Sequence, residues 1–396
     1  MPEQTGAVIR CRVSLISHAY AEERYRAKLL CISKGVDLEL VAPESFRFPY
    51  GTIRFEIDPA ARYRVRLLRS FFPVGVRTST RWILRSWDLG FRQFNPDIIH
   101  VENEAHSFIL LQAAVCRALF APRAKMLLFV WANMLPTGYK GVVFKALTRL
   151  LRSTIDFYLV GSSGGAELLG GLGVEAERIR VIPQSGIEHN LYRRASTLER
   201  QRQRDAVNLE TNDFVVGYVG RLTSAKGLGD LVAATELLRM SQPAIHARIL
   251  VVGDGPEKGR LSALAPQVVV VSPGGASATL PYYRAMDVLV LPSRTQRDWK
   301  EQFGRVLIEA MASMVPVVGS DSGAIPEVVG NAGLIFPEGD VRQLAALLRT
   351  LAEQPELRVK LGERGRDRVM KHYTVGRIAQ RTLEVYAERC RVTQGG

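Results

Sequence analysis

The sequence has little of what a disulfide-built, zinc-binding or membrane-spanning protein needs. Its 396 residues contain four cysteines, at positions 11, 31, 116 and 390, with no Cys-x-x-Cys pair. This spacing excludes a zinc ribbon and indicates reduced thiols that fill the core of a cytoplasmic protein. The apolar run at 7–16 is interrupted by Arg10 and Arg12, which favours a first strand over a signal peptide. Apolar runs also fall short of the roughly 18 residues that a spanning helix needs.

Acidic residues are also scarce, and no Asp-x-Asp motif for a divalent metal occurs. The formal charge is +14, and residues 47–92 hold ten arginines against three acidic residues. If 78–94 is one helix, Arg81, Arg85 and Arg92 share a stripe that could lie on an anionic membrane surface. The alternative is an ordinary helix with solvated arginines. Charge alone would also permit nucleic-acid binding, but no nucleic-acid-binding motif is present.

What is present is a repeated alternation of short β-branched runs and helix-compatible stretches. It predicts two parallel sheets, each covered by helices, in an α/β protein. A polar segment at 193–213 connects them, and a last helix is expected over 375–390. The expected strands are 8–16, 38–41, 98–101, 126–130, 157–160 and 180–182 in the first half and 214–219, 249–252, 268–271, 288–291, 315–318 and 333–336 in the second.

The strongest motif is a pair of glutamates, Glu301 and Glu309, around the start of a helix that Gly304 opens. A helix N-terminus attracts an anion, and two carboxylates beside it can accept hydrogen bonds from hydroxyls on either side of that anion. This arrangement suits a nucleotide sugar. Loops after the expected strands add Gly220, Arg221 and Lys226, then Gly253, at the edge where open parallel sheets bind ligands.

Four motifs in order resemble the retaining family 4 glycosyltransferases, which have the two-domain GT-B fold. They are 220–227, 252–256, the glutamate pair and 315–323, and together they span most of the second half. The resemblance implies two Rossmann-like domains facing a central cleft: an acceptor-side domain over 1–192, a nucleotide-sugar domain over 193–373, and a helix over 374–396 that packs back on the first domain.

The resemblance also implies roles for residues. Arg221 and Lys226 would neutralise a diphosphate, Glu309 would bind ribose and Glu301 the donor sugar, with backbone groups near Gln302, Phe303 and Gly304. Backbone groups at 272–275 would read the base. The donor would be a UDP- or GDP-sugar, the acceptor a glycan or lipid-linked molecule, and no metal or other cofactor would be needed. The enzyme would act in the cytoplasm, in polysaccharide or glycolipid synthesis. It could also bind peripherally to the inner face of the membrane.

The first domain departs from the family pattern, because the paired glycines common after its first strand are absent. His18 and Tyr20 stand there, Glu102 and His106 follow another expected strand, and Asn133 follows the next. His18, Tyr20, Glu102 and Asn133 are candidate acceptor contacts, and His106 is a candidate contact to the donor sugar. A structural role is the alternative for both histidines.

Three rival functions remain open at this stage. A sugar-nucleotide epimerase on the same fold would bind the donor alone. A basic protein that binds nucleic acid or membranes would leave the glutamate pair unexplained. A glycoside hydrolase needs two acids on either side of a glycosidic bond, but would leave the phosphate-suited loops without a purpose.

Overall fold

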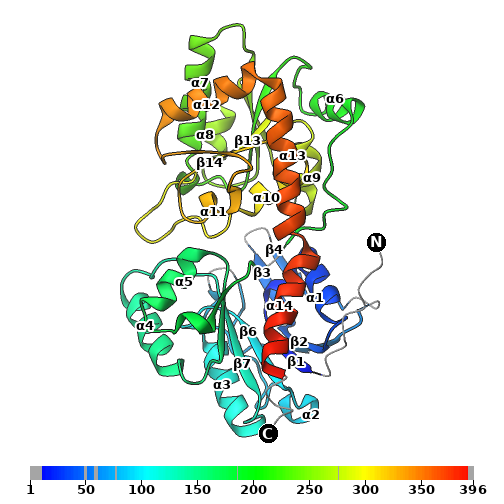
Figure 1. The fold of residues 1–396 in the computed structure, drawn as a ribbon, viewed down its shortest axis with the longest axis vertical. Coiled ribbons are helices and arrows are strands. Elements are labelled where there is room, and N and C mark those ends of the chain that lie inside the picture. Colours follow the sequence, from blue (N-terminus) through cyan, green and yellow to red (C-terminus); the bar gives the residue numbers. More distant parts are fainter. Residues whose placement is uncertain are drawn as a thin grey trace. The chain divides into compact units, whose positions relative to one another are not determined.

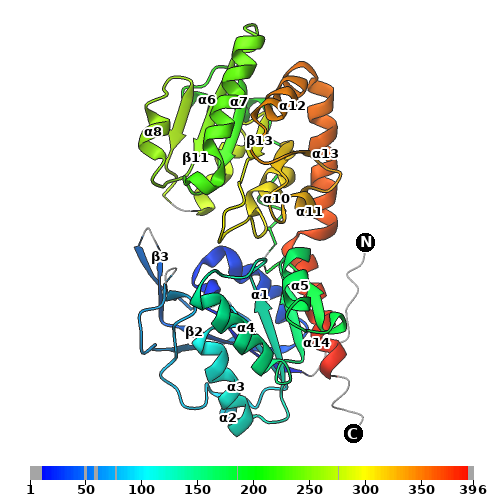
Figure 2. The same cartoon turned by 90° about the vertical axis from the view of Figure 1, so that its left-hand side faces the viewer.

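The computed structural model describes residues 11–48, 51–57, 61–75, 78–184, 186–274 and 276–390. The chain forms two compact units, drawn in Figure 1 and from a second side in Figure 2. Unit 1 comprises Met1–Gly186 with Val375–Gly396, and unit 2 comprises Ile187–Thr374. The divisions therefore fall at 186/187 and 374/375, where the sequence predicted 192/193 and 373/374.

Unit 1 is built on a parallel sheet with the strand order β5-β2-β1-β6-β7-β8-β9. Its central strands are buried on both faces, as expected for runs rich in Val, Ile and Leu covered by helices. The sequence missed β5 and the antiparallel pair of β3 and β4. The strands are β1 (Arg12–Ile16), β2 (Asp37–Pro43), β3 (Ser45–Phe48), β4 (Gly51–Arg54), β5 (Arg64–Leu68), β6 (Ile98–Glu102), β7 (Lys125–Val130), β8 (Phe157–Val160) and β9 (Ile179–Val181). Residues 8–10 of the expected first strand lie outside the described residues.

The helices of unit 1 include the last helix of the chain. That helix, α14, packs beside α1, and the Tyr386 hydroxyl lies 2.7 Å from Nδ1 of His100 on β6. The α-helices are α1 (Arg26–Ile32), α2 (Phe91–Phe94), α3 (Phe108–Phe120), α4 (Tyr139–Leu151), α5 (Ser163–Gly170) and α14 (Val375–Cys390). Cys11 and Cys390 are paired as a disulfide that joins the residue before β1 to the end of α14, so the expectation of reduced thiols is wrong for these two. They approach because β1 and α14 pack in one core.

Unit 2 repeats the architecture with the parallel strand order β12-β11-β10-β13-β14-β15. The strands are β10 (Phe214–Val219), β11 (Ala247–Val252), β12 (Val268–Val271), β13 (Val288–Leu291), β14 (Val317–Ser320) and β15 (Leu334–Phe336). The helices are α6 (Thr197–Asp205), α7 (Leu228–Ser241), α8 (Lys258–Ser262), α9 (Leu280–Tyr283), α10 (Arg305–Ala312), α11 (Ile325–Val329), α12 (Val341–Glu353) and α13 (Pro355–His372). The prediction of two helix-covered parallel sheets is confirmed.

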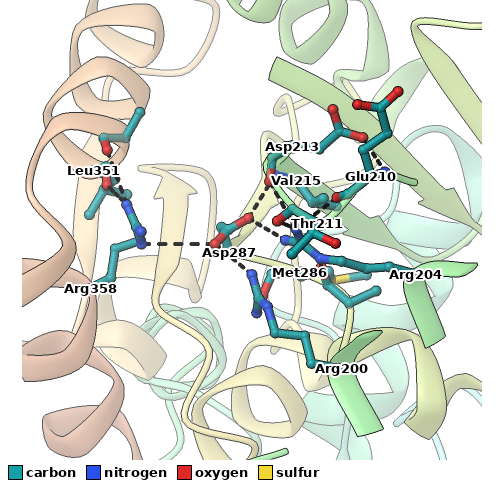
Figure 3. A network of polar contacts seen from close by, with 12 residues as sticks. Arg200, Arg204, Glu210, Thr211, Asp213, Val215, Met286, Asp287, Leu351 and Arg358 are labelled. Carbon is teal, nitrogen blue, oxygen red and sulfur yellow. Dashed lines mark hydrogen bonds and ion pairs between the residues drawn. The ribbon is translucent and has the colours of Figure 1, made fainter. Parts of the chain in front are cut away.

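The polar segment expected as a connector is an ordered part of unit 2. Asp287, just before β13, accepts hydrogen bonds from Arg200 and Arg204 of α6, each at 2.7 Å, and from the Val215 amide at 2.8 Å (Figure 3). Arg204 is buried, and its remaining donors reach four backbone carbonyl groups of the same unit. Because the buried charges are paired and hydrogen-bonded, removal of one partner is expected to be strongly destabilising.

The condition that 78–94 is one helix is not met: apart from α2 at its end, this segment is irregular. Trp82 and Leu84 are both buried at alternate positions, and the Gln112 amide hydrogen-bonds the backbone of Leu84 and Ser86 in place of helical partners. The three arginines therefore share no helical stripe. Arg81 donates to the Tyr139 hydroxyl, Arg85 lies over the Phe71 ring and Arg92 over the Trp87 ring.

Within the described residues, no helix combines the length and apolar character needed to cross a bilayer.

Candidate active site

The polar motifs of unit 2 gather where the strand order of its sheet reverses. β10 lies between β11 and β13, so the chain leaves β10 toward one edge of the sheet and later returns to its other side. Loops after such neighbouring strands diverge and leave a place for a ligand beyond their carboxyl ends. The loop after β10 carries Arg221 and Lys226, and the loop after β13 carries Ser293 and Glu301.

Lys226 and Glu301, which are 75 positions apart in sequence, form the centre of this site. The Lys226 ammonium donates to Oε2 of Glu301 at 2.6 Å, and the Ser293 hydroxyl donates to the same oxygen at 2.8 Å. The ammonium also lies 4.4 Å from the centre of the Trp299 ring. Both charged side chains are mostly buried, with 13% and 10% of their area exposed. The ammonium has three donors, so it can add an anionic ligand to these contacts.

Two glycines allow the loops of the site to approach closely. Gly227, directly after Lys226, has φ +66°, and a Cβ there would lie 1.8 Å from the Pro292 carbonyl oxygen. Gly323, after β14, has φ +56°, and a Cβ there would lie 2.1 Å from the Glu301 carbonyl oxygen. Only glycine fits both the left-handed backbone and the space. The glycine-containing motifs thus fix the positions of Lys226 and Glu301.

Glu309 lies within α10 and is more buried than the sequence suggested. Its Oε2 accepts a 2.7 Å hydrogen bond from the Tyr283 hydroxyl, and its Oε1 accepts a 2.8 Å bond from Arg305. Only 4% of the residue is exposed. A carboxylate has about four lone-pair sites, so contact with a ribose hydroxyl is possible in addition to these bonds and stays a prediction.

The other predicted donor-side residues lie around this centre. Gln302 is exposed and Gly304, with φ +75°, precedes α10, while the Phe303 ring packs edge-on against Tyr373 at 5.7 Å. Gly220 and Gly253 follow β10 and β11, and the Gly253 Cβ position is filled by the Gly220 carbonyl group. The Arg221 side chain is exposed. Of the segment 272–275 expected to read the base, Gly275 lies outside the described residues.

Four residues that position the site were missed. Ser293 and Trp299 contact the central pair, Tyr283 contacts Glu309, and Arg294 forms a forked ion pair with Asp230 of α7. Ser293 could have been found, because it follows an expected strand at the same edge as Gly220. Tyr283 carried no local signal, since it lies in a short helix 26 positions before its partner.

Unit 1 has its own strand-order reversal, between β1 and β6, and His18 follows β1 there. Its ring stacks on Phe46 with centroids 4.7 Å apart and lies 5.9 Å from both Trp82 and Trp131. Burial lowers the His18 pKa to about 4 against an opposing effect of Glu102, so the imidazole is neutral near pH 7. Its Nδ1 has no hydrogen-bond partner within the described residues.

Tyr20 and Glu102 contact each other inside unit 1. The Tyr20 hydroxyl donates to Glu102 at 3.0 Å, and Glu102 also pairs with Lys28 at 3.0 Å and accepts from Gln184 at 3.1 Å. All of Tyr20, Lys28 and Glu102 are buried. Burial opposes ionisation of Glu102, but Lys28 and His100 hold its pKa below the usual value. This geometry disfavours direct acceptor contact by Tyr20 and Glu102, which stays an untested prediction.

The remaining candidates of unit 1 follow β6 and β7. Asn133 is buried, and the His106 ring packs 5.5 Å from Phe144 of α4. Burial, assisted by Lys140, lowers the His106 pKa. Glu104 is a carboxyl group that the sequence analysis did not single out: burial raises its pKa to about 7, although the backbone amides of Ala132 and Trp131 donate to it.

The two Rossmann-like domains, with a polar site at the strand-order reversal of unit 2 (its switch point), define the fold class of the protein as GT-B. Two family models match the chain: "Glycosyl transferases group 1" over residues 199–368, and "Glycosyl transferase 4-like domain" over residues 10–185. The chain belongs to the group 1 glycosyltransferase family, and the resemblance drawn from its motifs is confirmed.

The chain is also similar to two curated enzymes and to one solved structure. It is 27% identical to the sulfoquinovosyl transferase SQD2 of Arabidopsis thaliana over 71% of this chain and 54% of that protein. It is 32% identical to a D-inositol 3-phosphate glycosyltransferase of Kineococcus radiotolerans over 56% of this chain and 54% of that protein. The chain spans about half the length of these relatives. The solved structure of Anabaena HepE in complex with UDP has a TM-score of 0.70 at 18% identity, covering 96% of this chain and 100% of that one.

Proposed function

We propose that this protein is a retaining glycosyltransferase that moves a sugar from a UDP- or GDP-sugar to a glycan or lipid-linked acceptor, in polysaccharide or glycolipid synthesis. The observation that carries the proposal is the Lys226–Glu301 pair at the switch point of unit 2, held by Ser293 and Trp299. A cation beside a hydrogen-bond acceptor for hydroxyls matches the diphosphate and sugar of such a donor. The UDP held by the structurally similar HepE supports the same choice.

In the proposed reaction, Lys226 and Arg221 stabilise the negative charge that grows on the diphosphate as its bond to the sugar breaks. Glu301 orients the donor sugar through its hydroxyls, Glu309 orients the ribose, and His106 contacts the donor sugar. The acceptor hydroxyl attacks from the face that the diphosphate leaves, and a phosphate oxygen takes its proton. The anomeric configuration is then kept without a nucleophilic side chain.

The proposal assigns charge stabilisation to side chains and to the N-terminus of α10, and therefore expects activity without a divalent metal. Loss of activity with a chelator and its return with magnesium or manganese would contradict this part of the proposal. We also propose that the enzyme acts in the cytoplasm.

A thermal-shift panel of nucleoside diphosphates and nucleotide sugars tests the proposed donor. A ligand that binds only the folded state raises the midpoint of thermal unfolding by mass action. We expect UDP or GDP, and more so one of their sugars, to raise it. An epimerase would give the same shift but convert the donor alone, so product analysis with and without acceptor separates the two. A basic nucleic-acid-binding protein would show no shift with any nucleotide sugar.

A further inference from the structure

The outer face of α4 in unit 1 is apolar where an ordinary surface helix would be polar. Tyr139, Val142 and Leu150 are 65%, 68% and 69% exposed, and Val143 and Ala146 are exposed beside them. In a helix of 3.6 residues per turn these positions form one stripe. The opposite stripe already packs on the core of unit 1 and includes Phe144, Thr148 and Leu151. The helix is therefore apolar on two faces, and only one of them is covered.

The exposed stripe is bordered by positive charge alone. Lys140, Lys145, Arg149 and Arg152 are all exposed, and no acidic residue occurs from 138 to 155. None of these four side chains forms an ion pair with another residue in the described part of the chain. Arg81 donates to the Tyr139 hydroxyl at 2.8 Å and adds a fifth cation where α4 begins.

The position of α4 leaves it accessible to a partner. It lies on the outside of unit 1 in both views, along the edge in Figure 1 and toward the viewer in Figure 2. Phe108, 42% exposed at the start of α3, lies next to this region because its amide donates to the carbonyl group of Thr80, the residue before Arg81.

We infer that α4 is a membrane-contact surface, which lies on an anionic lipid bilayer with Tyr139, Val142, Val143 and Leu150 between the headgroups. An interfacial helix needs an apolar stripe with lysine and arginine at its borders, and α4 has both. Charge complementarity selects the partner: a second copy of this chain would bring cations against cations, whereas an anionic lipid surface attracts each of them. This surface differs from the arginine stripe predicted over 78–94, of which only Arg81 contributes.

The inference does not depend on glycosyl transfer, because the contact would form without donor or acceptor. It adds that a lipid-linked acceptor would be met at the surface where unit 1 is bound. Vesicle binding can fail while nucleotide binding persists, and nucleotide binding can fail while vesicle binding persists. The membrane contact and the proposed glycosyl transfer are therefore tested separately.

The test is sedimentation of the full-length protein with phosphatidylcholine vesicles that contain increasing phosphatidylglycerol. We expect binding that grows with the anionic fraction and weakens in 0.5 M salt. The double variant Arg149→Gln with Leu150→Gln should lower the partition coefficient at least tenfold. The matched control is Arg202→Gln with Leu198→Gln on α6, where the same side-chain types are exposed in unit 2, and it should bind as the parent does.

Both variants replace exposed side chains, so thermal midpoints equal to that of the parent would exclude unfolding as the cause. The inference is overturned if the parent does not sediment with anionic vesicles at low salt, or if the α4 variant sediments as the parent does. It is also overturned if the parent is a dimer in sedimentation velocity and the α4 variant a monomer, since α4 would then bind a second copy.

Discussion

Glu301 is the residue whose charge and position the proposed reaction uses most directly. Glu301→Gln keeps its shape but removes the negative charge opposite Lys226, with which it now pairs at 2.6 Å. We expect turnover to fall by at least 100-fold, while affinity for the free nucleoside diphosphate changes little or rises, because Lys226 is freed for phosphate. Steady-state kinetics with calorimetric binding of the diphosphate would show this. Equal losses in binding and turnover would contradict the assignment of Glu301 to the sugar.

Glu309 is predicted to act on the nucleotide and not on the sugar. Glu309→Gln should weaken diphosphate binding by roughly 1 to 3 kcal/mol, the effect of losing a charged hydrogen bond. Because Tyr283 donates to the same carboxylate, Tyr283→Phe is the control: it removes the supporting bond and leaves the charge. We expect it to weaken binding less. If Glu309→Gln binds the diphosphate as tightly as the parent, the ribose assignment is wrong.

Glu104 should make the stability of the protein depend on pH. Burial raises its folded-state pKa to about 7, above the usual 4.5. A carboxyl group whose pKa is raised by folding stabilises the folded state at pH values below its unfolded-state pKa. This stabilisation is lost progressively as the pH rises to about 7. The loss amounts to roughly 1.4 kcal/mol for each pH unit that separates the folded and unfolded pKa values. Glu104→Gln should remove it.

The measurement is the difference in thermal midpoint between Glu104→Gln and the parent from pH 4.5 to 8. The thermal midpoint of the variant should rise relative to that of the parent up to about pH 7, and the difference should then stay constant. Burial lowers the pKa values of His18 and His100 to about 4, so these two groups make stability increase with pH in the acid range. Their contribution is the same in the parent and in the variant, and it cancels in the difference. A difference that does not vary with pH would contradict the raised pKa of Glu104.

At the scale of elements, close loop packing at the carboxyl edge of unit 2 sets the geometry of the site. Gly227→Ala would bring a methyl group to 1.8 Å from the Pro292 carbonyl oxygen at a φ of +66°. We expect a lower thermal midpoint and weaker nucleotide binding, since the Lys226 and Ser293 loops must move apart. Gly229→Ala is the control, because its Cβ would have open space within α7. It should leave binding unchanged and stabilise slightly through helix propensity. Similar behaviour of the two variants would contradict the packing account.

Some helices and strands could be predicted from the sequence, and others could not. The parallel strands were predictable because each is a short, continuously apolar run, and the site loops were predictable because parallel strands end at a common edge. The segment 78–94 was not: its aromatic and arginine spacing fits a helix, but the side-chain amide of Gln112 from α3 binds its backbone instead. The Tyr283 contact with Glu309 and the Cys11–Cys390 pairing likewise depend on packing between segments far apart in sequence.

At the scale of the whole molecule, two parallel-sheet units each place polar loops at a strand-order reversal, and the two have different chemistry. Unit 2 collects Lys226, Glu301 and the start of α10, which suit a nucleotide sugar. Unit 1 presents the aromatic surroundings of His18 and, on α4, a basic and apolar surface. From this division we propose that unit 2 binds the nucleotide of the donor and that unit 1 binds the acceptor.

The central claim is that the switch point of unit 2 binds the diphosphate of a nucleotide sugar through Lys226 without a metal. Isothermal titration of UDP and GDP in the presence of a chelator tests it most directly, on the parent, on Lys226→Ala and on the control Lys360→Ala, an exposed lysine of α13. We predict that the parent and Lys360→Ala bind one of the two diphosphates equally well, and that Lys226→Ala loses roughly 1 to 3 kcal/mol of binding free energy. Undiminished binding by Lys226→Ala, or binding by the parent only when magnesium or manganese is restored, would contradict the account.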